Sequence, residues 1–349
     1  MPSQQLIALL RSPQSHRNLP EAHWNALIEQ GRQTQLLGQL AALLQREKLL
    51  DQVPHAVQRH LTLALLTVMR RNETALWEVD TLRRAVDPKI PLVLLKGCAY
   101  LASADDNAPG RMFSDMDVLV RRQDLPVVEA SLMSVGWKPS RVNDYDQAYY
   151  RNWMHEVPPM VHVRRHTVVD LHHAINPPVS RFYIAPELLF ERRVEVRPGI
   201  FVLSVDDRVI HCALHLLQEG DPGKVIRDLY DFHLLLRQHH SSADSLEALY
   251  QRARTFKIAA QIEFAIGAAH ALFAIAPVGH TRTGWLQACL VRAGMDANGP
   301  ATLAGNVAGL ALQAYAHWMK MPVHILLPHL VHKSRAHMTF GKSPALGAT

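Results

Sequence analysis

The chain has 349 residues, 48% of them hydrophobic and 19% charged, with a formal net charge of +6 at pH 7. A chain of this length can bury a large core, and we expect two domains or one domain with a helical extension. The excess positive charge is moderate and spread along the sequence. It favours phosphate-bearing ligands but falls short of the basic stripe of a nucleic-acid-binding protein, so no stable nucleic-acid complex is expected.

The sequence has no feature of a disulfide-rich, exported or membrane-spanning protein. Its three cysteines, Cys98, Cys212 and Cys289, are far apart and form no C-x-x-C pair, which indicates neither a disulfide framework nor a thiolate zinc site. The N-terminus lacks a basic start followed by an apolar core, and no run of about 18 uncharged apolar residues occurs. We therefore expect a cytoplasmic protein without a membrane span.

The predicted elements fall into three regions. Residues 21–85 carry apolar side chains at helical spacing with few breakers. Residues 91–175 mix short strands with helices, and the chain then returns to helices. These patterns predict an α+β protein with an N-terminal helical region (1–88), a mixed-sheet domain (89–205) and a C-terminal helical domain (206–349).

Short apolar runs in the middle region predict its strands. They are, in chain order, 91–95, 116–120, the two halves of 160–175 around a tight connection at 165–167, and 199–205; a helix is predicted at 122–137. The first predicted strand ends at Lys96-Gly97, where a helix is predicted to begin.

Two aspartates open the predicted strand in GRMFSDMDVLV, residues 110–120. Side chains at i and i+2 of a strand point to the same face, so Asp115 and Asp117 project together, about 7 Å apart along the backbone. A lone pair of this kind is commonly two solvated residues at a strand end, with Ser114-Asp115 as a turn. Two close carboxylates are also ligands that hold Mg²⁺ together with substrate phosphates.

Two neighbouring features favour the metal-binding interpretation. Asp170 lies between Val169 and Leu171 in an apolar strand, where a carboxylate is costly to bury without a charge partner, and it could complete a triad. At Lys96-Gly97 the backbone N–H groups of a helix start could cradle phosphates, and Lys96 adds a positive charge. The order of these pieces along the chain is more specific than any one of them.

The motifs in this order resemble those of a known family. VLLKGCAYL, GRMFSDMDVLV and VVDLHHAI, preceded by helices and followed by HCALHLL and RDLYDFHLLL, are similar to a bacterial family of largely uncharacterised nucleotidyltransferases. That family belongs to the polymerase-beta type and carries K-G, R-x-x-x-D-x-D-x-L-V and [DE]-L-H. The resemblance covers roughly residues 20–240 and implies a nucleotidyltransferase-type mixed-sheet catalytic domain flanked by helical regions.

The resemblance assigns nucleotide-binding positions. Gly97 takes the place of the glycine in the family's phosphate loop, and Lys96 replaces the small residue usually paired with it. Arg111 matches the arginine four positions before Asp115, where it could reach a triphosphate, and Ser114 occupies the small-residue position before the same aspartate. The segment from Gly97 to Asp115 is longer than usual, and SADDNAPG is predicted to be an extra loop.

The resemblance also implies a catalytic, metal-binding triad and a reaction. Asp115 and Asp117 match the metal-binding pair and Asp170 the third acid, so the expected cofactor is Mg²⁺ or Mn²⁺ and the co-substrate an NTP. The family mechanism transfers a nucleoside monophosphate to an acceptor hydroxyl and releases pyrophosphate, and Asp170 could take the hydroxyl proton.

Three hypotheses about the acceptor remain open. A small molecule, such as a sugar or an antibiotic hydroxyl, is slightly favoured and would need a pocket between the catalytic and C-terminal domains. A protein side chain or an RNA end would need an open basic cleft. A nucleotide-binding module without turnover is the third hypothesis, and the intact Asp115, Asp117 and Asp170 argue against it.

Two histidines follow Asp170. His172 lies on the same strand face as Asp170 by period-two spacing, so it could orient that carboxylate or contact the acceptor, and we include it among the binding residues. An ordinary hydrogen-bonded strand histidine is the alternative. His173 points to the other face and is predicted to be structural.

Other polar residues of the helical regions are given structural roles. His211 and His215 have the i, i+4 spacing of zinc ligands, but no third ligand follows, so a helix face packed near the catalytic domain is preferred. Asp228 and Asp231 lie on a helix at a position where, by resemblance, such enzymes place the helical domain over the nucleotide or acceptor, but a solvated helix face is the preferred interpretation for both.

Two further predictions concern contacts with partners. The apolar N-terminal helices could form a homodimer surface. The histidine-rich segment 317–338 could touch a membrane surface or a partner, but Pro322 and Pro328 interrupt the helix and favour a packing role. The last residues, 341–349, are predicted to fray.

Overall fold

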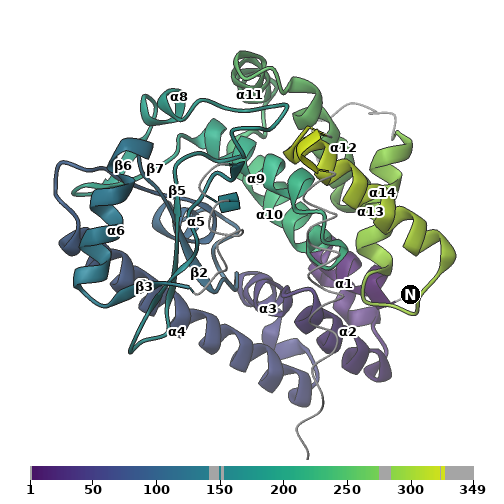
Figure 1. The fold of residues 1–349 in the computed structure, drawn as a ribbon. Coiled ribbons are helices and arrows are strands. Elements are labelled where there is room, and N and C mark those ends of the chain that lie inside the picture. Colours follow the sequence, from purple (N-terminus) through teal and green to yellow (C-terminus); the bar gives the residue numbers. More distant parts are fainter. Residues whose placement is uncertain (1, 141–148, 151–152, 275–283, 323, 327–349) are drawn as a thin grey trace, which may run out of the picture.

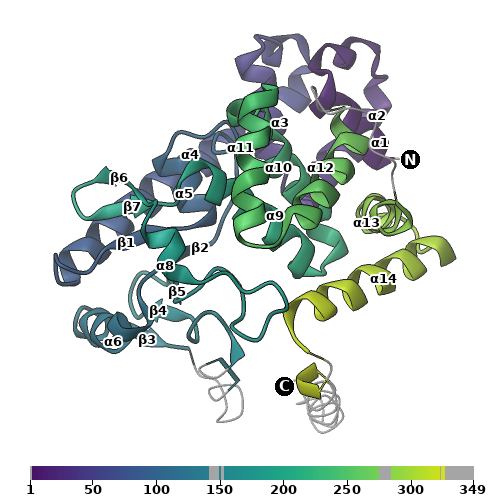
Figure 2. The ribbon, with the colours of Figure 1, turned by 90° about the horizontal axis from the view of Figure 1, so that it is seen from above.

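A seven-stranded mixed sheet lies on one side of the molecule and most of the helices lie on the other (Figures 1 and 2). The fold is that of a computed structural model, which describes residues 2–140, 149–150, 153–274, 284–322 and 324–326. The predicted α+β class, with a mixed sheet flanked by helices, is confirmed. The division into regions 1–88, 89–205 and 206–349 stays a prediction.

The strands are short and come from the middle of the chain. They are β1 (Leu92–Leu94), β2 (Asp115–Leu119), β3 (Trp137–Pro139), β4 (Met160–His162), β5 (Val168–His172), β6 (Val194–Arg197) and β7 (Ile200–Val202). Their order in the sheet is β3-β4-β5-β2-β1-β7-β6. β2 runs parallel to β5, with Asp117 opposite Asp170, and antiparallel to β1. The two acidic strands are therefore neighbours at the centre of the sheet.

The helices come from both ends of the chain and from the segments between the strands. They are α1 (Pro2–Arg11), α2 (Glu21–Gln33), α3 (Leu37–Arg46), α4 (His55–Ala85), α5 (Lys96–Ala102), α6 (Leu125–Ser134), α8 (Pro186–Phe190), α9 (Val205–Glu219), α10 (Val225–His239), α11 (Ala243–Thr255), α12 (Ala259–Phe273), α13 (Trp285–Asp296) and α14 (Leu303–Lys320). Short 3-10 turns include η4 (Pro222–Lys224), which joins α9 to α10.

The two faces of the sheet have different neighbours. Met116 and Val118 of β2 belong to a core cluster that contains residues of α4 and α6. Leu119 belongs to the larger cluster, formed with α1–α3 and α9–α14. Because strand side chains alternate between faces, Asp115 and Asp117 lie on the same face as Leu119, toward the main helical body.

Local signals define α9, a helix of the main helical body. Ser204 caps its start by accepting a hydrogen bond from the backbone N–H of Asp207 at 3.3 Å. Gly220 ends the helix with φ of 71°, in the left-handed region that glycine adopts at helix ends. The chain then turns through η4 into α10, so the start of α10 lies close to the end of α9.

Some element boundaries differ from the prediction. The helix expected at 122–137 ends at Ser134, because Gly136 has φ of 100° and the fully buried Trp137 begins β3. The short β6 and α8 were not predicted, since elements of four or five residues leave little periodicity. The tight connection at 165–167 between two strands is present.

The C-terminal part of the chain is described only as far as residue 326. α14 ends at Lys320, shortly before Pro322, as a proline that cannot continue a helix predicts. Pro328, most of the histidine-rich segment and residues 341–349 lie outside the described residues.

No helix in the described ranges is long and apolar enough to cross a membrane.

Candidate active site

Three carboxylates gather at the centre of the sheet. Asp115 and Asp117 lie on β2, and Asp170 lies opposite Asp117 on the neighbouring parallel strand β5. One oxygen of each of the three carboxylates lies within 4.8 Å of the others. Parallel pairing in this register brings together side chains that are more than fifty residues apart in the sequence. The arrangement can hold a divalent cation.

Asp117 is bonded to two basic side chains. Its Oδ1 accepts hydrogen bonds from Lys96 Nζ at 2.7 Å and from His172 Nε2 at 2.9 Å. Burial on its own would raise the pKa of Asp117, but the Lys96 ammonium and His172 hold it well below its ordinary value. Asp117 is therefore ionised, and Lys96 supplies a neighbouring positive charge.

Asp170 has the opposite environment. Burial, followed by the negative charges of Asp117 and Glu156, raises its pKa to about 7. Its Oδ1 is buried and has no hydrogen-bond partner in the described part of the chain. An unpartnered buried oxygen beside two other carboxylates fits a cation ligand, because a cation would satisfy the oxygen and offset the repulsion.

The start of α5 holds Lys96 and Gly97 beside these carboxylates. Lys96 has φ of 46°, an unfavourable left-handed conformation for a lysine, and its ammonium reaches Asp117. A Cβ on Gly97 would lie 2.7 Å from the ring of Phe113, so only glycine fits without displacing that ring. Phe113 belongs to the long segment before β2, which thus contacts the strand-to-helix turn directly.

The long segment between α5 and β2 is anchored rather than loose. Asp105 is buried and pairs with Arg208 of α9 at 3.1 Å. Gly110, with φ of 75°, lies against the backbone of Gly38, where a Cβ would be 2.1 Å from the Gly38 carbonyl oxygen. The predicted extra loop therefore packs on both helical regions.

Arg111 is buried and points toward α10. Its Nε donates to Asp231 Oδ2 at 2.6 Å, and its guanidinium lies over the ring of Tyr100. Burial alone would lower the pKa of Arg111, but the Asp231 carboxylate raises it above its ordinary value. The side chain lines the cavity beside Asp115, yet a protein carboxylate already neutralises it.

The interpretation of Asp228 and Asp231 as a solvated helix face was wrong. Both are buried. Asp231 binds Arg111, and Asp228 binds Arg227 at 2.7 Å. A sequence pattern on one helix does not show which basic side chains of other elements will face it, so the pairing was missed.

His172 contacts a different carboxylate from the one expected. It is fully buried, and its Nε2 bonds Asp117 at 2.9 Å and lies 3.4 Å from Glu156. These contacts with Asp117 and Glu156 match the hydrogen-bonded alternative, not a role in orienting Asp170. His155, Glu156 and His172 form a second set of potential metal ligands within 4.8 Å of one another. His155 and Glu156 were not predicted, because they lie in an irregular segment.

His211 and His215 lie near the sheet, as the packing interpretation expects. Burial, followed by the Lys96 and His215 charges, lowers the pKa of His211 well below its ordinary value. His215 lies 3.7 Å from Glu219 and 3.6 Å from Asp228. Among the described residues, neither histidine belongs to a cluster with metal-ligand geometry.

A cavity of about 250 Å³ opens beside Asp115 and Asp117. Its lining includes predicted residues from the sheet side, namely Lys96, Gly97, Arg111, Ser114, Asp115 and Asp117. It also includes residues that were not predicted, namely Gln35, Arg71, His215, Lys224 and Arg227. Gln35 and Arg71 precede the strands in the sequence, and the other three residues follow them. Only the tertiary fold brings these residues to the cavity.

The mixed sheet brings three carboxylates together beside a strand–glycine–helix turn, as the resemblance to nucleotidyltransferases implies. A family model described as uncharacterised nucleotidyltransferase matches residues 20–274, well over half of the chain, and the protein belongs to this family. The family expected from the motifs is thereby confirmed. Comparisons with curated proteins and with solved structures gave no match.

Proposed function

We propose that the protein transfers a nucleoside monophosphate from an NTP to an acceptor hydroxyl and releases pyrophosphate. The observation that carries the proposal is the approach of Asp115, Asp117 and Asp170 to within 4.8 Å, next to the Lys96-Gly97 turn. Membership of a nucleotidyltransferase family supports the same reaction class.

Asp115, Asp117 and Asp170 would hold Mg²⁺ or Mn²⁺. The unpartnered Oδ1 of Asp170 and the crowding of three carboxylates fit such an ion. When bound, the ion neutralises phosphate charge and lowers the pKa of the acceptor hydroxyl.

The chain's own residues then have distinct parts in the reaction. The acceptor oxygen forms a bond to the α-phosphorus, its proton passes to the Asp170 carboxylate, and the bond from the α-phosphorus to the pyrophosphate oxygen breaks. Lys96 contributes a fixed positive charge beside the phosphates, and the backbone at Gly97 allows their close approach. His172 holds Asp117 in place through the 2.9 Å hydrogen bond.

The test is transfer of label from each α-labelled NTP in the presence of Mg²⁺ or Mn²⁺ and a cell extract. Wild type is compared with Asp115→Asn/Asp170→Asn and with Asp244→Asn, a matched control on the exposed surface of α11. Transfer by wild type and the control, but not by the double variant, supports the proposal. Absence of both transfer and metal-dependent NTP binding in wild type would refute it.

The same experiment identifies the class of acceptor. We expect a small hydroxyl compound, so the labelled product should be small enough to pass an ultrafiltration membrane. Label retained with protein or with RNA would instead support a macromolecular acceptor.

A further inference from the structure

The cavity beside Asp115 and Asp117 is rich in basic side chains. Five Lys or Arg side chains line it, and they are Arg71, Lys96, Arg111, Lys224 and Arg227. They come from α4, α5, the segment before β2, η4 and α10. A small space in which cations from five elements converge favours a ligand with several negative charges.

Four of these cations are paired with carboxylates, two of them outside the start of α10. Lys96 binds Asp117, and Arg111 binds the buried Asp231. Arg71 differs, because it is exposed on α4 and its side chain makes no ion pair or hydrogen bond with any residue that the structure describes. Its charge is available to a ligand in the cavity.

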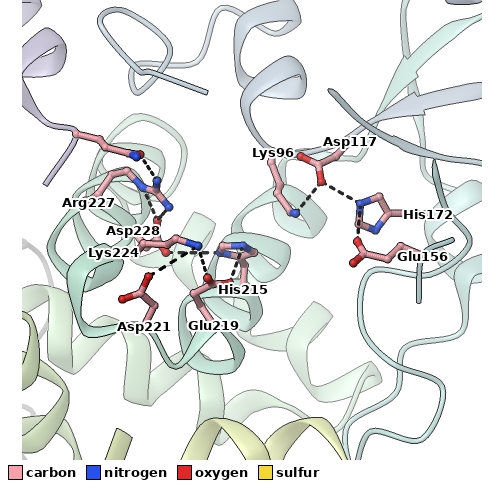
Figure 3. A network of polar contacts seen from close by, with 11 residues as sticks. Lys96, Asp117, Glu156, His172, His215, Glu219, Asp221, Lys224, Arg227 and Asp228 are labelled. Carbon is pink, nitrogen blue, oxygen red and sulfur yellow. Dashed lines mark hydrogen bonds and ion pairs between the residues drawn. The ribbon is translucent and has the colours of Figure 1, made fainter. Parts of the chain in front are cut away.

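The cations at the start of α10 are held by a shared network (Figure 3). Lys224 pairs with Glu219, which also lies 3.7 Å from His215. Arg227 binds Asp228 at 2.7 Å, and its Nη1 donates to Gln35 Oε1 at 2.5 Å. Asp221 also lies 4.0 Å from Lys224, so Lys224 and Arg227 share one network with three carboxylates, Glu219, Asp221 and Asp228. The network orients Lys224 and Arg227 before a ligand arrives, while both side chains still line the cavity.

Figure 3 shows this network beside the separate group formed by Lys96, Asp117, His172 and Glu156. The cavity lining joins the two groups, since Lys96 and Asp117 line it together with His215, Lys224 and Arg227. A ligand in this space would contact the carboxylate site at one end and α10 at the other.

We propose that Arg71, Lys224 and Arg227 form a triphosphate clamp, which binds the β- and γ-phosphates of the NTP and the pyrophosphate product. This inference rests on the proposed function and adds to it residues from two helical regions outside the motifs. The polyphosphate lies between α4 and the start of α10, with the α-phosphate toward Asp115 and Asp117. The clamp selects triphosphates over monophosphates and does not select the base.

The test measures the binding of inorganic pyrophosphate, the four NTPs and AMP by titration calorimetry with Mg²⁺ present. The variants are Arg71→Ala and Lys224→Ala, both of side chains with considerable exposure, which keeps effects on folding small. Arg70→Ala is the matched control, because it removes the same charge from the adjacent position, where the side chain is 85% exposed and does not line this cavity.

Each clamp variant should lower the affinity for pyrophosphate and for all four NTPs by roughly tenfold, the usual effect of losing one charge-assisted hydrogen bond. Affinity for AMP should stay as in wild type, and Arg70→Ala should behave as wild type. If wild type transfers label while both clamp variants bind pyrophosphate normally, the clamp is wrong and the transferase proposal stands. If wild type binds neither NTP nor pyrophosphate, the proposed function fails as well.

Discussion

Asp117 and Asp170 lie opposite each other on the neighbouring strands β2 and β5, but their surroundings differ. Asp117 accepts hydrogen bonds from Lys96 and His172, whereas Asp170 has a buried oxygen without a hydrogen-bond partner in the described chain. The hydrogen bonds of Asp117 thus stabilise the fold, whereas Asp170 has an oxygen that can bind a ligand. Substitution can separate the two roles.

Asp117→Asn should lower the free energy of unfolding by about 2–4 kcal/mol, because it leaves the partly buried Lys96 ammonium without the counter-charge of Asp117. Asp170→Asn should leave the free energy of unfolding unchanged or raise it, since it removes repulsion from Asp117 and Glu156. Urea unfolding followed by circular dichroism at pH 7.5 measures both. Equal losses in the two variants would contradict the assignment.

His233, a histidine of α10, should make stability depend on pH. Burial, followed by the charge of Arg237, lowers the pKa of His233 from 6.5 to about 4. Between these values the unfolded chain binds a proton that the folded chain does not, so the free energy of unfolding falls as the pH falls from 6.5 to 4. The contribution of His233 is up to about 3 kcal/mol.

His233→Phe isolates this contribution, because the ring stays between Tyr230 and Phe273. Urea unfolding at pH 7 and pH 5 should show a smaller loss of stability in the variant than in wild type. Other buried histidines affect both proteins equally. An identical pH dependence in the two would show that His233 does not titrate in this range.

Among the elements, α10 ties the sheet to the helical body. Its Asp231 binds Arg111 at 2.6 Å and accepts a hydrogen bond from Gln39 of α3 at 2.9 Å. Its Arg237 makes a more exposed pair with Asp106 at 2.8 Å. One helix thus provides a buried and an exposed ion pair to the same loop.

Asp231→Asn should lower the free energy of unfolding by about 3–5 kcal/mol, because Arg111 would remain buried and unpaired. Asp106→Asn, the control in the exposed pair, should cost less than about 1 kcal/mol. Chemical unfolding of the two variants gives the comparison. A small effect of Asp231→Asn would mean that water or another group satisfies Arg111.

For the whole molecule, the main consequence is that the cavity joins distant parts of the chain. Its lining contains Arg71 of α4, the residues at the start of β2, and Lys224 and Arg227 at the start of α10. A ligand there contacts all three parts and is bound only when they are folded together. Ligand binding should therefore stabilise the entire fold.

Mg²⁺ with pyrophosphate should raise the thermal midpoint of unfolding, with about 2.7 kcal/mol of stabilisation when the ligand is at 100 times its dissociation constant. Removal of Mg²⁺ with EDTA should reverse the shift. Asp115→Asn/Asp170→Asn should show a smaller shift, because two of the three proposed metal ligands have lost their charge. Differential scanning calorimetry measures each case, and an equal shift in the double variant would contradict the proposed metal site.

Much of the fold and part of the site were predictable from local sequence patterns. Period-two spacing placed Asp115 and Asp117 on one face of a strand. The spacing of apolar residues indicated the helices that precede and follow the strands in the sequence. Short elements such as β6 escaped prediction, since they are too brief for a period to show.

The sequence by itself determined the class of fold, the family and the set of motif residues, because these depend on backbone periodicity and on the order of residues along the chain. Only the tertiary structure decided which charges meet. Arg111 and Asp231 are 120 residues apart, and Gln35 and Arg227 are 192 residues apart, yet each pair is in contact. Such contacts depend on how all the helices pack around the sheet, and no local pattern records that packing.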